Sequence, residues 1–271
     1  MYVLYPYIGK RKLTLRMALF FTFVLKGIAA FNREKDKYDE EREKGRCSMK
    51  KKGMEREADE SIGVREEARA VEERIIVVPA NKASWEDLEA VLGSARCHGA
   101  PCYCQRFKIS YNDWSLTDDQ ERAFMLRAQT DCGNPESNTT SGLVAYLDQE
   151  PVGWCAVEPR TAYKKLRSSP VPWSGRDEDK NDNSVMAISC FIVRKGYRRR
   201  KITYALAKAS ISFARKRRAH AIEGYPMRTV PGKDIPWGEL HVGSRNAFIA
   251  AGFREVSAPT KRRVVMRIDF K

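Results

Sequence analysis

The chain has little histidine and no regular cysteine spacing, and these two absences argue against whole classes of site. It has three histidines in 271 residues, and its seven cysteines are odd in number and irregularly spaced. Disulfide frameworks use even sets of cysteines, and structural zinc sites combine Cys-x-x-Cys pairs with a second cluster. The stretch Cys97-His98-x3-Cys102-x-Cys104 fits neither pattern, so we interpret its cysteines as buried thiols. We therefore expect no metal and a reducing, cytoplasmic compartment.

Long apolar runs are also missing. The longest near the N-terminus, Met17 to Leu25, is flanked by Arg16 and Lys26. It falls short of the roughly 20 apolar residues that a helix needs to cross a bilayer. We therefore expect no membrane contact unless residues 13–31 act as an anchor.

The next stretch of chain is too charged to fold by itself. Residues 32–74 interleave Glu, Lys, Arg and Asp with few apolar residues. Such a segment cannot bury enough apolar surface to offset the entropy lost on ordering. We predict a poorly ordered N-terminal extension over residues 1–74, followed by one folded domain over residues 75–271. Met49 and Met54 leave a later start of translation open, as well as cleavage of the extension.

The charge balance points to anionic partners. Lys and Arg together number 50 against 35 for Asp and Glu, a formal net charge of +15. This favours a nucleotide cofactor, nucleic acid or an acidic membrane surface, without choosing among them. No Ser-His-Asp arrangement, Walker loop or dinucleotide fingerprint is found in the sequence.

The most informative stretch is residues 185–227. A β-branched and apolar run, Val185 to Val193, precedes a turn at 194–197 and four consecutive cations at 198–201. A helix follows, and a second apolar run covers Ala221 to Pro226. We predict a strand–helix–strand unit. The buried face of its helix is marked by the apolar residues that recur at helical spacing, namely Ile202, Ala205, Leu206, Ala209 and Phe213.

The four cations are predicted to lie at the first turn of this helix, where they are unfavourable. A helix N-terminus already carries partial positive charge, so added cations there cost stability. Their placement makes sense if an anion binds to the turn. A phosphate group is the usual ligand of free N–H groups at a helix N-terminus. We therefore interpret the turn as a phosphate-binding site.

The rest of the domain reads as a mixed sheet with flanking helices, an α/β or α+β fold. Ser84 and the box at 117–120 indicate helix starts, and residues 148–151 indicate a hairpin turn. The Pro, Ser, Gly and acidic residues of 159–184 indicate a long exposed loop. The remaining predicted elements are strands at 75–78, 143–147, 152–157, 254–256 and 264–268, and helices at 84–94, 117–133 and 245–251.

Residues 193–206, Val-Arg-Lys-Gly-Tyr-Arg-Arg-Arg-Lys-Ile-Thr-Tyr-Ala-Leu, resemble the acyl-coenzyme A binding motif of GNAT-type N-acetyltransferases. That motif, Gln/Arg-x-x-Gly-x-Gly/Ala, falls on Arg198, Lys201 and Thr203. It is degenerate here, because Lys201 and Thr203 replace the small residues. The resemblance extends to residues 142–157, which are similar to a hairpin of the family, and to 246–256, similar to its last helix and the following strand.

The resemblance, over about residues 75–270, implies fold and activity together. The fold would be a GNAT-like central sheet, mostly antiparallel and flanked by helices. The activity would be transfer of an acetyl group from acetyl-CoA, the co-substrate, to an amine by direct attack in a ternary complex. Acetyl-CoA and an amine acceptor would be the partners, with a homodimer left open.

The resemblance also implies which residues bind the cofactor. The strand before the motif would part from its neighbour, and the backbone of Phe191, Ile192 and Val193 would hold the pantetheine arm. The amides of Arg199, Arg200, Lys201, Ile202 and Thr203 would cradle the pyrophosphate, with Arg198 and Arg200 as charge partners. Asn246, which opens the last helix, would either contact the pantetheine or cap that helix.

Acetyl transfer needs a general base whose pKa lies near the operating pH, usually a partly buried carboxylate or a histidine. The candidates are Glu158, Glu223, Glu239 and His241. Glu223 interrupts an apolar strand and either lines the acceptor cleft or faces outward. Glu239 and His241 alternate, so on an extended segment they would face the same way.

A proton donor is needed for the departing thiolate. Many relatives place a tyrosine on the last helix for this role, and the matching position here is Phe248. A phenyl ring cannot donate a proton, so we expect Tyr225 or water to serve instead.

Two other functions compete with N-acetyltransferase activity. The altered motif and Phe248 favour a degenerate acyl-CoA-binding or regulatory domain without turnover. The net charge favours a nucleic-acid binder, but the basic turn lacks interleaved aromatic residues for base stacking, which argues against it.

Overall fold

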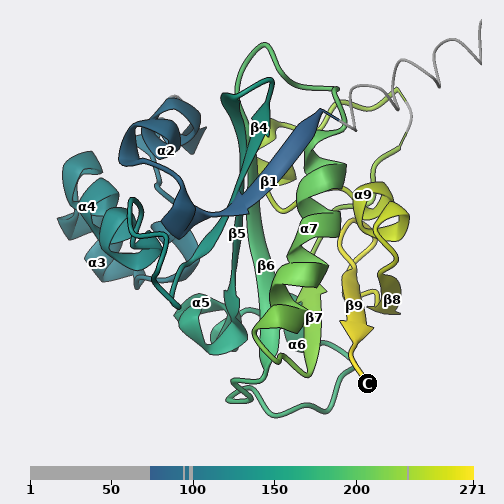
Figure 1. Ribbon diagram of the computed structural model, residues 1–271. Coiled ribbons are helices and arrows are strands. Elements are labelled where there is room, and N and C mark those ends of the chain that lie inside the picture. Colours follow the sequence, from purple (N-terminus) through teal and green to yellow (C-terminus); the bar gives the residue numbers. More distant parts are fainter. Residues whose placement is uncertain (1–73, 94, 98–99, 231) are drawn as a thin grey trace, which may run out of the picture. The chain divides into compact units, whose positions relative to one another are not determined.

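The computed structural model describes residues 74–271, apart from 94, 98–99 and 231. The predicted extension therefore lies, except for Arg74, outside the described residues. The described part holds a seven-stranded sheet in which only one neighbouring pair, β6 with β7, is parallel (Figure 1). This confirms the predicted mixed, mostly antiparallel sheet. The strands in spatial order are β1 (Ile75–Pro79), β4 (Gly142–Leu147), β5 (Glu150–Pro159), β6 (Val185–Val193), β7 (Ala221–Gly224), β9 (Val265–Asp269) and β8 (Arg254–Ser257).

Helices cover both faces of the sheet (Figure 1). On one face α2 (Trp85–Leu92) and α4 (Asp119–Thr130) enclose a core around Trp154 of β5. On the other, α7 (Ile202–Lys216) packs over Gly153, so closely that an added Cβ would lie 2.6 Å from Ile202 Cγ2. The shorter elements are β2 (Arg96–Cys97), β3 (Ala100–Pro101), α3 (Tyr111–Leu116), α5 (Lys164–Ser168), α6 (Pro170–Trp173), α8 (Trp237–Leu240), α9 (Arg245–Ala250) and three single 3-10 turns.

Helix starts follow the predicted capping chemistry, with one shift. Ser84 caps α2 and forms a capping box with Asp87, as expected. The box of α4 is formed by Asp118 and Glu121, so the prediction that it began at Thr117 was wrong by one residue. The aspartate takes the cap because its carboxylate accepts the Glu121 amide, 2.8 Å away.

The predicted hairpin is confirmed, and the predicted long loop is corrected. Asp148 and Gln149 both adopt positive φ, 53° and 69°, as a two-residue turn between β4 and β5 requires. Residues 159–184, in contrast, are not an exposed loop, because they contain α5 and α6. The buried Tyr163 and Leu166 anchor this segment against Tyr225.

The strand–helix–strand unit is confirmed as β6, α7 and β7, but the helix begins later than predicted. Ile202 is its first residue and Lys201 its N-cap, so all four cations precede the first helical residue rather than lying in the first turn. Of the five apolar residues predicted to face the core, Ile202, Leu206 and Phe213 are buried and the two alanines half-buried.

The two parallel strands pair only over their first four residues. The register runs from Val185 opposite Ala221 to Ile188 opposite Gly224, while β6 continues to Val193. On its other side β6 bulges, because Ala156 and Val157 of β5 pair with Cys190 and Ile188 and skip Ser189. Beyond Ile188 the strands separate, as the resemblance implied.

Phe248 of α9 packs at the point where the strands separate. It is fully buried and meets Phe191 and Phe253 edge to face, at centroid distances of 5.8 and 4.9 Å. An added Cβ at Gly224 would lie 2.4 Å from Phe248 Cε1. The Phe248 ring therefore occupies the space that a side chain at position 224 would need.

No helix in the described part of the chain is both long and apolar enough to span a membrane.

Gly224→Ala should destabilise the domain, because the new methyl group must displace a ring held on all sides. We expect a loss of about 1–3 kcal/mol in the free energy of unfolding, measured by urea titration. Gly238→Ala is the control, since an added Cβ there meets no atom within 4 Å. Adding Phe248→Leu should recover part of the loss in Gly224→Ala, and equal stability of both alanine variants would contradict this packing.

Candidate functional site

A cavity of about 420 Å³, here called the turn cavity, lies between the end of β6 and the start of α7. Seven of the ten residues implied for the cofactor line it: Phe191, Val193, Arg198, Arg199, Lys201, Ile202 and Thr203. The other three do not. Ile192 points to the opposite core because side chains alternate along a strand. Arg200 and Asn246 are exposed, and Ser244 caps α9, so Asn246 is not its N-cap.

The backbone of the basic turn is left-handed at two positions. Arg199 and Lys201 have φ of 65° and 63°. Lys201 thus adopts a conformation that glycine favours, at the position where the resembled motif has glycine. Its carbonyl accepts the amides of Tyr204 and Ala205, and no described side chain caps α7. The first amides of the helix therefore remain for a ligand.

Two tyrosines that the sequence analysis missed also line the turn cavity. Lys201 Nζ lies 4.6 Å from the ring centroid of Tyr204, and the Arg200 guanidinium lies 5.5 Å from that of Tyr197. The cations of the turn are thus partly held by aromatic faces. The statement that the basic turn lacks interleaved aromatic residues was therefore wrong, and the close spacing of Tyr197 and Tyr204 to the cations in the sequence was the signal that could have identified them.

Residues 238–244 form a wall against the separated half of β6. The Phe191 amide donates to the His241 carbonyl at 2.6 Å. Amides alternate along a strand, so the Val193 amide faces the same side, away from β5. Leu240, Gly243 and Ser244 line the turn cavity from this wall.

Glu223 is fully buried and held by arginines. Its carboxylate accepts from Arg160 at 3.1 Å, Arg176 at 2.7 Å and Arg267 at 3.0 Å. The sequence analysis expected Glu223 either to line the acceptor cleft or to face outward. Both expectations were wrong, because Glu223 is buried and lines none of the described cavities. The arginines come from the segment after β5, the segment before β6, and β9, so sequence distance concealed the cluster.

Tyr225 belongs to the same cluster. Its hydroxyl donates to Glu223 at 2.7 Å. Burial, followed by the Glu223 carboxylate, raises the pKa of Tyr225 well above its ordinary value. The hydroxyl therefore stays protonated and is a weak acid.

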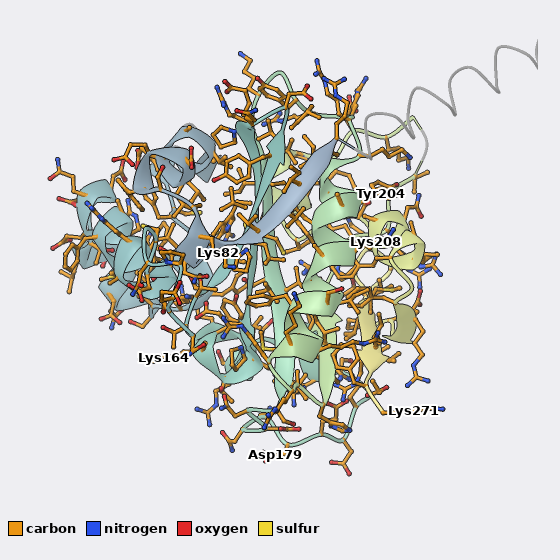
Figure 2. The ribbon with its side chains drawn as sticks, viewed as in Figure 1. Lys82, Lys164, Asp179, Tyr204, Lys208 and Lys271 are labelled. Atoms are coloured by element: carbon orange, nitrogen blue, oxygen red, sulfur yellow. The ribbon has the colours of Figure 1, made fainter. Side chains whose placement is uncertain are left out.

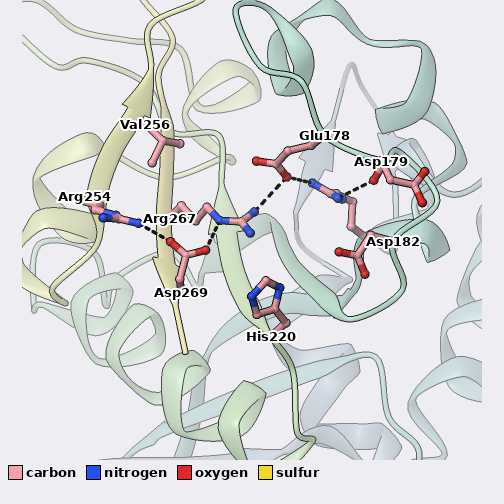
Figure 3. Close-up of a pocket in the computed structure, with 9 residues that line it drawn as sticks. Glu178, Asp179, Asp182, His220, Arg254, Val256, Arg267 and Asp269 are labelled. Carbon is pink, nitrogen blue, oxygen red and sulfur yellow. Dashed lines mark hydrogen bonds and ion pairs between the residues drawn. The ribbon is translucent and has the colours of Figure 1, made fainter. Parts of the chain in front are cut away.

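The arginine cluster borders a cavity of about 380 Å³ (Figure 3). Arg267 links Asp269, at 2.7 Å, to Glu178, at 3.2 Å, and Arg160 donates to the Asp179 carbonyl at 2.8 Å. Asp179 and Tyr204 lie toward opposite ends of the sheet (Figure 2), so this network is remote from the turn cavity.

Glu239 and His241 do not share an extended segment, and that prediction was wrong. Glu239 belongs to the short helix α8, is exposed and pairs with Arg262. His241 follows the helix, is 7% exposed, and its Nδ1 lies 2.8 Å from the Gly238 carbonyl. Because a carbonyl only accepts, Nδ1 carries the proton in the neutral ring and Nε2 is the basic nitrogen.

Glu158 is paired inside the protein. It forms an ion pair with Lys108, and both side chains are largely buried. Burial raises the pKa of Glu158, while Lys108 acts in the opposite direction. Lys108 also donates to Gln129 at 2.7 Å, which fixes the pair.

A third cavity, here called the basic cavity, measures about 660 Å³. It is lined by Arg106, Phe107, Met227, Gly238, Glu239, His241, Val242, Thr260, Lys261, Arg262 and Arg263. His241 thus faces this cavity, while neighbouring residues of the same wall face the turn cavity.

Four of the described cysteines behave as small buried side chains, while Cys132 is half-buried. Cys102, Cys104, Cys155 and Cys190 are buried thiols. Cys104 Sγ accepts from Trp154 Nε1 at 3.0 Å. Among the described residues, no three His, Cys, Asp or Glu side chains are grouped to hold a metal ion.

Comparison with known proteins agrees with this geometry. Residues 104–225 match the model of the acetyltransferase (GNAT) family, and the mixed sheet of the described residues is GNAT-like. A comparison with curated proteins gives no match.

Solved structures with a similar arrangement include three N-acetyltransferases. A GCN5-related N-acetyltransferase from Kribbella flavida is 17% identical, with 73% of this chain and 99% of that chain covered and a TM-score of 0.39. A ribosomal-protein-alanine N-acetyltransferase from Brucella melitensis is 17% identical over 72% and 99%, with a TM-score of 0.39. The PaiA N-acetyltransferase from Thermoplasma acidophilum, in complex with coenzyme A, is 14% identical over 72% and 99%, with a TM-score of 0.38.

The arginine network should make the domain sensitive to acid. Burial opposes the charged form of Glu178, but hydrogen bonds from Arg160 and Arg176 outweigh it and lower the pKa of Glu178. Its stabilising effect is therefore full above the ordinary value of 4.5 and is lost as pH falls through the lower folded value. Glu178→Gln, which cannot titrate, should lower Tm at pH 7 and flatten its decline between about pH 5 and 3.

Thermal unfolding across this pH range measures the effect. Glu136→Gln, at an exposed position, is the matched control and should keep the wild-type slope. Parallel Tm curves for wild type and Glu178→Gln would contradict the assignment.

Proposed function

We propose that residues 75–271 form an acetyl-CoA-dependent N-acetyltransferase that acetylates an amine by direct attack in a ternary complex. The observation that carries this proposal is the uncapped N-terminus of α7, bordered by Arg198, Arg199 and Lys201, beside two separating parallel strands. The GNAT domain match supports the same reaction class.

The donor site fits coenzyme A chemically. The first amides of α7 can donate to a pyrophosphate, since they point away from the helix and carry its positive end. Arg198, Arg199 and Lys201 add three positive charges around the cavity. The Val193 amide supplies a donor for the pantetheine arm. Lys201 adopts the left-handed backbone conformation that the glycine of the resembled motif would adopt, so replacement of this glycine does not change the course of the turn.

His241 is the general base in this proposal. Its basic Nε2 belongs to a nearly buried ring on the wall shared by the two cavities. The amine nitrogen attacks the thioester carbonyl carbon, and its surplus proton passes to Nε2. The carbon–sulfur bond breaks, and the thiolate takes a proton, from water or from the imidazolium, to give free coenzyme A and the acetylated amine.

The other candidates take structural roles. Glu223 is neutralised by three arginines and Glu158 by Lys108, so neither presents a carboxylate to a substrate. Glu239 is exposed and paired with Arg262. The Tyr225 hydroxyl is committed to Glu223, which leaves water or His241 to protonate the thiolate.

Arg198→Gln should weaken binding of acetyl-CoA about tenfold or more, as expected for a lost charge-assisted hydrogen bond. Arg200→Gln is the matched control, because it removes the same charge from the same turn but from a side chain that does not line the cavity. Calorimetric titration of both variants and of wild type measures the difference. Equal losses would show that only overall charge matters.

Lys201→Gly distinguishes an active transferase from a degenerate acyl-CoA-binding domain. In the proposal the wild-type chain binds acetyl-CoA, and glycine changes the affinity only a few-fold. Binding that requires glycine would indicate a decayed cofactor site, and no binding by either protein would contradict the transferase.

His241→Gln should lower kcat by about a hundredfold or more, the usual effect of removing a general base. The rate would be followed as thiol release with the best acceptor from a panel of primary amines. The rise of rate with pH that reports the imidazole should also disappear. His220→Gln is the control, because His220 lines the cavity of about 380 Å³ beside the arginine cluster. It should leave kcat and the pH dependence of the rate unchanged. A full rate in His241→Gln would assign the base elsewhere.

A further inference from the structure

The charges around the basic cavity are strongly one-sided. Four cationic side chains line it against one carboxylate, Glu239. Glu239 is paired with Arg262 and offsets one of these charges, so four cations and one carboxylate leave a net excess of three positive charges in the lining. The cavity therefore holds an excess of positive charge beside His241. The cations are Arg106, Lys261, Arg262 and Arg263.

Two of the four cations, Lys261 and Arg262, are exposed, but the cavity is more than a solvated surface. Its walls include Met227 and Val242, which are 3% and 2% exposed. Arg263 is held in place, since its guanidinium donates to the Tyr225 carbonyl at 3.0 and 2.6 Å. Burial, followed by the like charge of Arg262, lowers the pKa of Arg263. These cations repel one another in the free protein, and a bound anion would relieve that repulsion.

A similar repulsion is present at the other rim. Burial, and then the charge of Arg106, lowers the pKa of Lys165 on α5. Arg106 lies beside Phe107, whose ring centroid is 6.1 Å from that of His241. Positive charge thus approaches the proposed base from two separate segments, residues 106–107 and 260–263.

The position of the cavity connects it to the reaction. Residues 238–244 contribute walls to both the basic and the turn cavity. An anionic group held by Lys261 and Arg263 would place the rest of its molecule near His241. The volume of about 660 Å³ lies in the range of small-molecule sites.

We propose that the basic cavity is the acceptor site, and that the acceptor is a small amine carrying a carboxylate or phosphate group. This inference rests on the proposed acetyl transfer for the identity of the reacting group. The binding of the anion itself does not depend on it.

The test compares matched acceptors with the full chain and acetyl-CoA. β-Alanine is paired with β-alaninamide for the carboxylate, and O-phosphoethanolamine with ethanolamine for the phosphate. At least one anionic member should exceed its neutral partner in kcat/KM by about tenfold or more, mainly through KM. The pair that shows the larger ratio identifies the anion.

Variants locate the effect in the cavity. Lys261→Gln should reduce the anionic-to-neutral ratio of kcat/KM several-fold, because it removes a positive charge that only the anionic acceptor requires. Lys208→Gln is the control, because this exposed lysine of α7 (Figure 2) lines neither cavity. Equal rates for anionic and neutral amines would overturn the inference and leave the transferase intact.

Binding without the donor separates the two proposals. Calorimetry of each anionic amine, with no acetyl-CoA present, should show binding that Lys261→Gln weakens, even if the transferase proposal fails. If no amine is acetylated, absence of such binding overturns the inference by itself. A single-stranded oligonucleotide that binds more tightly, with steep salt dependence, and displaces the amines would assign the cavity to nucleic acid instead.

Discussion

The separation of β6 from β7 is the constraint on which the rest of the site depends. Four residue pairs join these parallel strands, and beyond Ile188 and Gly224 no pair continues. The bulge at Ser189 bends β6 at this point. The parted backbone leaves strand amides facing residues 238–244 and opens the space in which the turn cavity forms. The Phe248 ring fills the point at which the two strands separate. It leaves no room for a side chain at position 224, which is why that residue is glycine.

The paired half of the two strands is held by charge. Glu223 of β7 gathers arginines from three segments, and two further carboxylates, Glu178 and Asp269, balance them (Figure 3). A buried carboxylate is tolerated only when it is paired and hydrogen-bonded. The network therefore ties the segment after β5 and strand β9 to β7, and it does so at the end of the sheet remote from the basic turn.

Much of the architecture could be predicted, because it depends on local chemistry. The apolar run of β6, the turn at Asp148 and the cap at Ser84 act through neighbours in the chain, and each was found where expected. Local reasoning failed where tertiary contacts decide. The polar composition of 159–184 conceals two helical turns, because Tyr163 and Leu166 are anchored by residues more than fifty positions away. Glu239 and His241 do not face the same way, because a short helix replaces the expected extended segment.

The sequence by itself determined the order of the elements and the presence of a cationic turn before α7. Spacing, capping and charge act over a few residues and can be read along the chain. Only the tertiary structure decided which cations line a cavity, which carboxylates are neutralised, and that one wall borders two cavities. Those properties arise from segments far apart in the chain, and burial changes the chemistry of a side chain through neighbours that no local pattern specifies.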